Sequence, residues 1–158
     1  MSVAFRRESD EEHKEPRFEL PIPPGPNLVT EGGPALIDAR IAALEAEATD
    51  ADEARRGEIA RDLRYWNTRR VTAIVAPPPP ADEVAFGSRV RIRIDGAARD
   101  IRIVGDDEAD PAAGLIAFSA PLARALIGLG EGEDATLPGR GDVVEVVELS
   151  PTGLPPHA

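Results

Sequence analysis

Residues 103–128 read IVGDDEADPAAGLIAFSAPLARALIG, and this run orders a strand end, an acidic turn, a second strand and a short helix. The pattern predicts the second strand over Leu115 to Phe118 and one helix over Pro121 to Gly128, with Ser119 in its cap region. The run holds no nucleophile beside a base, no Cys or His ligand set and no phosphate-binding glycine loop. It therefore indicates surface recognition and not catalysis. The helix is expected to bury one face, which consists of Leu122, Ala125 and Leu126.

Further strands flank this run on both sides. Arginines alternate with Val or Ile over residues 89–94, which is the period of a half-buried strand. Asp95-Gly96 then predicts a tight hairpin turn into a strand over Ala98 to Val104, and Val143 to Leu149 predicts another strand. The C-terminal half is therefore predicted to be a small α+β domain with a mainly antiparallel sheet.

Two helical patterns precede this domain. The first follows a plausible N-cap at Thr30 and runs to about residue 48, and its apolar residues recur at coiled-coil spacings. Cap-type residues over Thr49 to Glu53 break that pattern, and a second helix follows. The pair is predicted to form an antiparallel helical hairpin. Its apolar side chains are Ile37, Ile41, Leu44 and Ala48 in the first helix and Ile59, Leu63 and Trp66 in the second, with Val71 and Ile74 on the flank.

Prolines divide the chain into segments. Pro77 to Pro80 end the second helix, because proline cannot continue a helix and a proline run forms a semi-rigid spacer. The predicted class is α+β, with a short coiled-coil hairpin followed by an antiparallel sheet and one short helix. Phe18, Leu20 and Ile22 in the N-terminal tail either form an extended binding segment or pack on the hairpin. The predicted parts are a tail over 1–29, the hairpin over 30–76, a Pro-rich linker over 77–82, the C-terminal domain over 83–150 and a tail over 151–158.

Composition excludes several classes of protein. The chain has 158 residues, no Cys and a net charge of −11, so disulfide scaffolds and thiolate metal sites are excluded and direct DNA binding is disfavoured. No secretion signal and no apolar run of about 20 residues is present, which predicts a soluble cytoplasmic protein. Residues 54–71 are basic, which suits docking on a charged protein surface but is more simply explained by a solvated helix face.

The sequence resembles the Gre transcript-cleavage factors, GreA and GreB, over residues from about 27 to 149. The most specific motifs are VAFGSRV at 84–90, IVGDDEAD at 103–110 and IAFSAPLARALIG at 116–128, in the order of the family. The stretch NLVT at 27–30 is a weaker match to the opening motif of the family. The resemblance implies an FKBP-like C-terminal domain that docks on RNA polymerase at the rim of the secondary channel, against the β′ coiled coil. The corresponding docking residues are Asp106, Asp107, Glu108, Ser119, Pro121, Leu122 and Ala123.

The chain departs from this family at the hairpin tip. The acidic tip motif that helps the family hold a catalytic Mg²⁺ is absent, and both arms are short, as in the relative Rnk. The new tip holds Asp50, Asp52 and Glu53, which suit helix capping, a contact in the polymerase channel or metal-assisted cleavage. At 1.5 Å per residue the first arm spans only roughly 25 Å, which limits its reach.

Three functions remain open at this point. The first is a Gre-like regulator that binds polymerase without stimulating cleavage, has no catalytic residues, metal or cofactor, and is a monomer. The second is a cleavage factor that uses the three tip acids. The third is a prolyl isomerase on the FKBP-like fold, which would need an aromatic-lined pocket although Phe86 and Phe118 are expected in the core. Trp66 is expected to pack at the hairpin base, and Tyr65 to lie on a partner-binding surface or in solvent.

Overall fold

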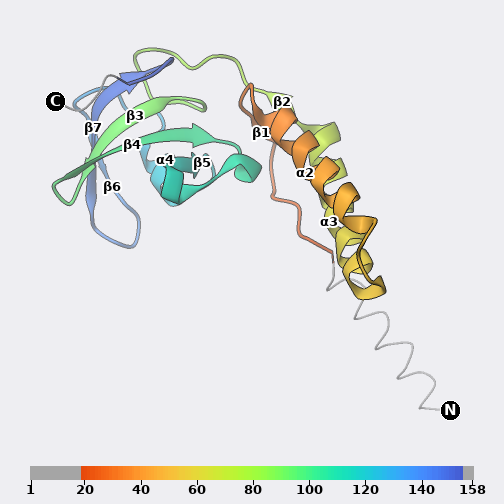
Figure 1. Ribbon diagram of the computed structural model, residues 1–158. Coiled ribbons are helices and arrows are strands. Elements are labelled where there is room, and N and C mark those ends of the chain that lie inside the picture. Colours follow the sequence, from red (N-terminus) through yellow and green to blue (C-terminus); the bar gives the residue numbers. More distant parts are fainter. Residues whose placement is uncertain (1–18, 155–158) are drawn as a thin grey trace. The chain divides into compact units, whose positions relative to one another are not determined.

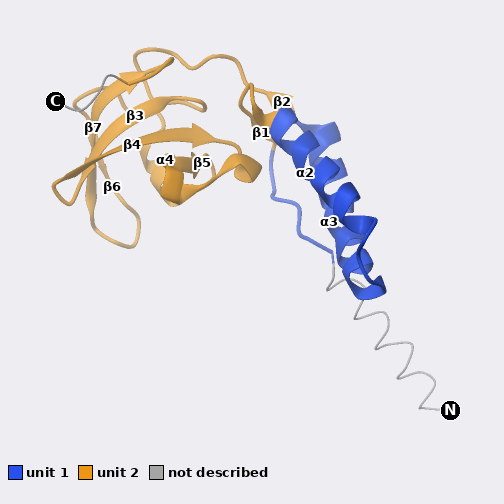
Figure 2. Ribbon diagram, viewed as in Figure 1, with its two compact units in different colours: residues 1–25, 34–73 blue, residues 26–33, 74–158 orange. Residues whose placement is uncertain are grey.

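The computed structural model describes residues 19–154 (Figure 1). Residues 1–18, with Phe18, and residues 155–158 lie outside the described residues, as do the corresponding parts of the two predicted tails. The described chain forms two compact units, which Figure 2 distinguishes by colour. The hairpin unit holds residues 19–25 and 34–73, and the sheet unit holds residues 26–33 and 74–154.

The hairpin unit contains the two predicted helices, α2 (Gly33–Ala48) and α3 (Glu53–Thr72). Ile37 in α2 and Ile59 in α3 are completely buried, and the other residues of the predicted α2 seam are half-buried. The apolar spacing therefore identified the packed residues of α2 and the middle of α3, but the predicted flank residues Val71 and Ile74 are exposed. Leu20 and Trp66 are half-buried, whereas Ile22 is 46% exposed.

Two short strands bracket the hairpin in sequence. β1 (Leu28–Val29) and β2 (Ile74–Val75) pair in parallel, with the Ile74 amide donating to the Asn27 carbonyl over 2.9 Å. The sequence predicted a tail for the first pair of residues and a helix for the second, and both predictions were wrong. The helix ends at Thr72 because Ala73 takes an extended conformation, which the β-branched residues and the prolines that follow also favour.

The sheet unit holds a five-stranded sheet in the order β5-β4-β3-β7-β6. Only the β4–β5 pair is parallel, which confirms the mainly antiparallel prediction. Asp95 and Gly96 both have positive φ, as a two-residue hairpin turn requires. The strands are β3 (Arg89–Ile94), β4 (Ala97–Val104), β5 (Leu115–Ala117), β6 (Asp134–Thr136) and β7 (Val143–Ser150).

The helix α4 (Pro121–Leu126) packs against both β5 and β6, which are the opposite edges of this sheet. One six-residue helix can contact both edges because the sheet curls around it, as Figure 1 shows. The helix buries Ala123 and Leu126 completely, while the predicted Leu122 and Ala125 are only partly buried. It ends two residues before the predicted Gly128 because Ile127 leaves the helical region of φ and ψ. No helix within residues 19–154 is long and apolar enough to cross a membrane.

Candidate functional site

The acidic turn after β4 presents two carboxylates on one short element. Asp106 and Asp107 begin the 3₁₀ helix η1 (Asp106–Glu108), and both side chains are half-buried at the surface. The hydroxyl of Ser119 donates a hydrogen bond to Asp106, which joins this turn to the segment that leads into α4. The resemblance grouped these residues as a docking surface, and the structure brings them together.

Glu108 points inward from the same turn. Its Oε1 accepts from the amides of Thr30 and Gly105, each over 2.9 Å, and its Oε2 accepts from the Thr30 hydroxyl. Because only 8% of Glu108 is exposed, its carboxylate holds the turn and is not available to a partner. Thr30 is accordingly a ligand of this carboxylate and not the N-cap that the sequence predicted, since α2 begins three residues later.

Gly105 is required at the start of this turn by a close backbone approach. A Cβ at this position would lie 2.4 Å from the Leu28 carbonyl oxygen and 2.8 Å from Oε1 of Glu108. Any larger residue would therefore push β1 away from the turn. The glycine of the IVGDDEAD motif thus has a packing reason that the strand pattern alone did not reveal.

The start of α4 contributes the apolar part of the surface. Pro121 is exposed at the first turn of the helix, and Leu122 beside it is half-buried. Ala123 is completely buried in the core of the sheet unit, so it cannot contact a partner as the resemblance implied. The accessible part of the predicted docking surface, referred to below as the docking surface, consists of Asp106, Asp107, Ser119, Pro121 and part of Leu122.

A groove continues this surface between α4 and β6. It encloses about 500 Å³ and begins at Pro121, so it shares that residue with the docking surface. No pattern in the sequence predicts this groove, because β6 is a three-residue edge strand without apolar alternation. Its lining residues are Pro121, Arg124, Ala125, Ala135, Thr136 and Pro138.

The acids at the hairpin tip mostly support the helix that follows them. Asp52 is the N-cap of α3 and accepts from the Arg55 amide over 2.8 Å, and Glu53 is the first helical residue. Asp50 is exposed. Within residues 19–154, no three His, Asp or Glu side chains are grouped so that they could hold a metal ion.

Arg55 joins the two helices near this tip. Its guanidinium reaches Glu47 over 3.0 Å and Glu58 over 2.9 Å. The hydrogen bond from Arg55 lowers the pKa of the Glu47 carboxyl. The tip is thus fastened by charge pairs between exposed side chains.

The arginines of α3 are engaged inside the hairpin unit. Arg64 pairs with Glu19, Arg70 with Asp38 over 2.7 Å, and Arg61 with its neighbour Asp62. The remaining two are Arg56, which donates to the Ala48 carbonyl, and Arg69, which is 2% exposed and lies over the Tyr65 ring at 6.0 Å. The basic stretch of the sequence is therefore a set of internal pairs.

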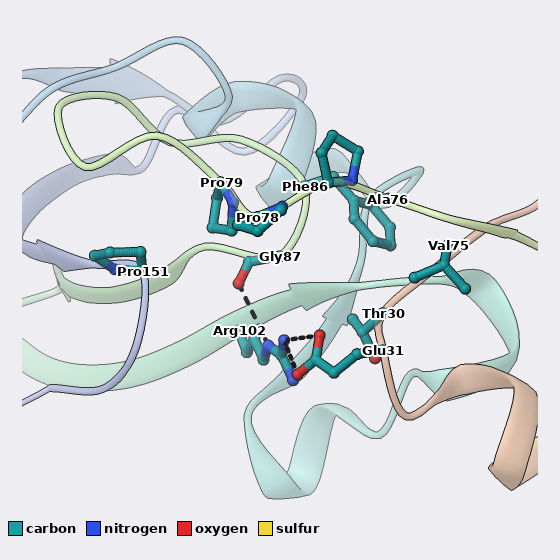
Figure 3. Close-up of a pocket in the computed structure, with 11 residues that line it drawn as sticks. Thr30, Glu31, Val75, Ala76, Pro78, Pro79, Phe86, Gly87, Arg102 and Pro151 are labelled. Carbon is teal, nitrogen blue, oxygen red and sulfur yellow. Dashed lines mark hydrogen bonds and ion pairs between the residues drawn. The ribbon is translucent and has the colours of Figure 1, made fainter.

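A second pocket of the sheet unit lies where the proline run meets Phe86 (Figure 3). Arg102 lines this pocket and donates to Glu31 over 3.0 Å and to the Gly87 carbonyl over 3.3 Å. Its single aromatic residue is Phe86, whose ring meets Phe118 edge-on at 5.4 Å. The pocket encloses about 390 Å³ and is lined by Thr30, Glu31, Val75, Ala76, Pro77, Pro78, Pro79, Phe86, Gly87, Arg102 and Pro151.

Comparison with solved structures gives weak overall likeness. The Thermus thermophilus GreA factor homolog Gfh1 is 20% identical with a TM-score of 0.39, and the match covers 80% of this chain and 99% of that one. The GreA/GreB transcription elongation factor of Nitrosomonas europaea is 23% identical with a TM-score of 0.38, covering 78% of this chain and 98% of that one.

Comparison with curated sequences is more informative. Transcription elongation factor GreB of Neisseria meningitidis serogroup B is 39% identical over 84 residues, which cover 51% of this chain and 52% of that protein. The chain thus spans about half the length of that relative. GreA of Verminephrobacter eiseniae is 30% identical over 158 residues, which cover 94% of this chain and 98% of that protein. The model of the C-terminal domain of the transcription elongation factors GreA and GreB matches residues 79–151. The chain therefore belongs to the GreA/GreB family of transcription elongation factors.

Proposed function

We propose that this protein binds bacterial RNA polymerase at the rim of the secondary channel, against the β′ coiled coil, through the accessible docking surface of its sheet unit. The observation that carries the proposal is the pair Asp106 and Asp107, presented beside the exposed Pro121. Carboxylates on a short braced turn can form charge-assisted hydrogen bonds with Arg or Lys on a helical tip. An adjacent apolar side chain adds the anchor that such interfaces commonly use.

We also propose that the short hairpin modulates access to the channel without stimulating transcript cleavage. Asp52 is committed to capping α3, and Glu53 occupies the first helical turn, where the helix dipole favours an acid. Of the three tip acids, Asp50 alone has no such structural use among the described residues. Asp50 is therefore the single tip carboxylate without a capping or first-turn role, and one carboxylate is a poor site for a metal ion.

A pull-down with core RNA polymerase tests the docking proposal. Asp107→Lys should abolish binding, whereas Glu83→Lys, which makes the same charge change at an exposed residue that is not part of the docking surface, should bind normally. Glu108→Gln should also bind, because that side chain faces inward. Unchanged binding by Asp107→Lys would refute the proposed surface.

A cleavage assay on stalled elongation complexes tests the second part. Addition of the protein with Mg²⁺ should leave the RNA length unchanged. RNA shortening that disappears in the double variant Asp50→Ala with Asp52→Ala would instead establish the protein as a cleavage factor.

A further inference from the structure

The sheet unit contains one arginine that differs from all its others. Between residues 76 and 158 the sequence has seven Arg and no Lys, against fourteen Asp and Glu. Within the described part of the chain, six of these arginines reach an acceptor in the protein. Their acceptors are the Pro151 carbonyl for Arg89, Asp100 and Glu148 for Arg91, Glu145 for Arg93, the Pro111 carbonyl for Arg99, Glu31 for Arg102 and Asp142 for Arg140.

Arg124 is the exception. It is exposed on α4, and among residues 19–154 it has neither an ion pair nor a hydrogen-bond acceptor for its guanidinium. Two acids that flank β6 in sequence have partners of their own, since Glu133 accepts from the Gly130 amide and Asp142 pairs with Arg140. Residues 76–158 have twice as many acids as arginines, yet no carboxylate of the described residues pairs with the Arg124 guanidinium. Its positive charge can therefore pair with a carboxylate of another molecule.

Arg124 lies in a groove that adjoins the docking surface. It lines the groove of about 500 Å³ between α4 and β6, whose other walls are mostly apolar. Pro121 belongs both to this groove and to the docking surface, so the two are continuous. The combined surface carries negative charge at Asp106 and Asp107, an apolar centre at Pro121 and a positive charge at Arg124.

We propose that the groove with Arg124 is a second docking element, which receives a carboxylate and a flanking apolar side chain from the same protein partner that places a basic group at Asp106 and Asp107. This inference rests on the proposed function. A guanidinium forms bidentate hydrogen bonds with a carboxylate, and the low polarity of the groove walls strengthens such a pair. Opposite charges at the two ends of the surface fix the orientation of the partner, which a single acidic turn does not.

Binding of core RNA polymerase, measured by biolayer interferometry over a salt series, tests the inference. Arg124→Gln should weaken binding by about tenfold, as expected for loss of a charge-assisted hydrogen bond at an interface. The matched control is Arg99→Gln, which removes an exposed arginine outside the groove and should change affinity less than about twofold. Thr136→Glu provides an independent variant, because a carboxylate inside the groove would occupy Arg124 and should also weaken binding.

The outcomes separate this inference from the proposed function. If Arg124→Gln and Thr136→Glu bind as the unmodified protein does while Asp107→Lys does not bind, the second element is refuted and the docking proposal stands. If Asp107→Lys also binds normally, both proposals fail. A loss that occurs with elongation complexes but not with nucleic-acid-free core enzyme would assign Arg124 to a phosphate and overturn the protein contact.

Discussion

Removal of the Glu108 carboxylate should destabilise the sheet unit far more than its replacement by an amide. In Glu108→Ala, the amides of Thr30 and Gly105 both lose their acceptor, Oε1, in a site that is closed to water. Each buried N–H without a partner costs about 1–3 kcal/mol, so the free energy of unfolding should fall by about 4 kcal/mol.

Glu108→Gln is the informative variant because it keeps an oxygen in the Oε1 position. Both amide hydrogen bonds can persist, and the Thr30 hydroxyl can rotate to accept from the new NH₂ group. The expected loss is about 1 kcal/mol, from weaker bonds to a neutral acceptor. Thr30→Val removes only the hydroxyl and should cost about 1–2 kcal/mol, with a smaller additional loss in the Glu108→Gln background because the two groups interact.

Urea unfolding followed through the NMR amide signals of β3 and β4 measures these changes in the sheet unit. Trp66 fluorescence is unsuitable for it, because Trp66 lies in the hairpin unit. Equal destabilisation by Glu108→Gln and Glu108→Ala would refute the assignment of Oε1 as the shared acceptor. A loss below about 1 kcal/mol in Glu108→Ala would show that water reaches both amides.

Three further outcomes follow from local geometry. Asp52→Ala should lower the stability of the hairpin unit by about 1 kcal/mol, because alanine cannot accept the hydrogen bond from the Arg55 amide. Asp52→Asn keeps an acceptor and should be about as stable as the unmodified protein. Thermal melts followed by Trp66 fluorescence measure both variants. Arg55 lowers the pKa of Glu47 in the folded state, so this pair stabilises the hairpin at pH values above the unfolded Glu pKa of about 4.3. That stabilisation is lost as the pH falls through the lower folded pKa. Glu47→Gln should therefore reduce the pH dependence of hairpin stability in this range. Gly105→Ala should destabilise the sheet unit because the added Cβ would clash with the Leu28 carbonyl. Gly57→Ala, in α3 with open space around it, should stabilise the hairpin unit by about 1 kcal/mol in urea titrations. Equal effects of the two alanines would contradict the contact with Leu28.

Periodicity predicted most of the helices and strands because apolar residues recur at the repeat of each element, although Arg91 of β3 is buried and paired with Asp100 and Glu148. The seam of α2, the alternation of β3 and the Asp95-Gly96 turn each depend on residues that are neighbours in sequence. β1 and β2 were missed because each has two residues, and their pairing depends on a contact between distant parts of the chain. β6 was missed for a similar reason, since its position on the edge of the sheet is defined by β7.

The candidate site shows the same division. The resemblance identified the acidic turn and the start of α4, and the structure groups Asp106, Ser119 and Pro121 there. It did not separate outward from inward side chains, so Glu108 and Ala123 were predicted as docking residues although both are buried. The partner of Glu108 is Thr30, 78 residues earlier in the chain, and no local pattern predicts that contact.

The buried Glu108 clarifies why consecutive acids of one turn have different roles. A 3₁₀ turn directs successive side chains about 120° apart, so three adjacent carboxylates cannot all face one partner. The turn directs Glu108 toward the amides of Gly105 and Thr30, which fixes the backbone that carries Asp106 and Asp107. The rigidity of the proposed docking turn thus depends on an acid that faces inward, and its loss should reduce affinity for polymerase through the order of the turn. Normal affinity for polymerase in Glu108→Gln together with reduced affinity in Glu108→Ala would establish this indirect role. A direct charge contact would instead be lost in both variants.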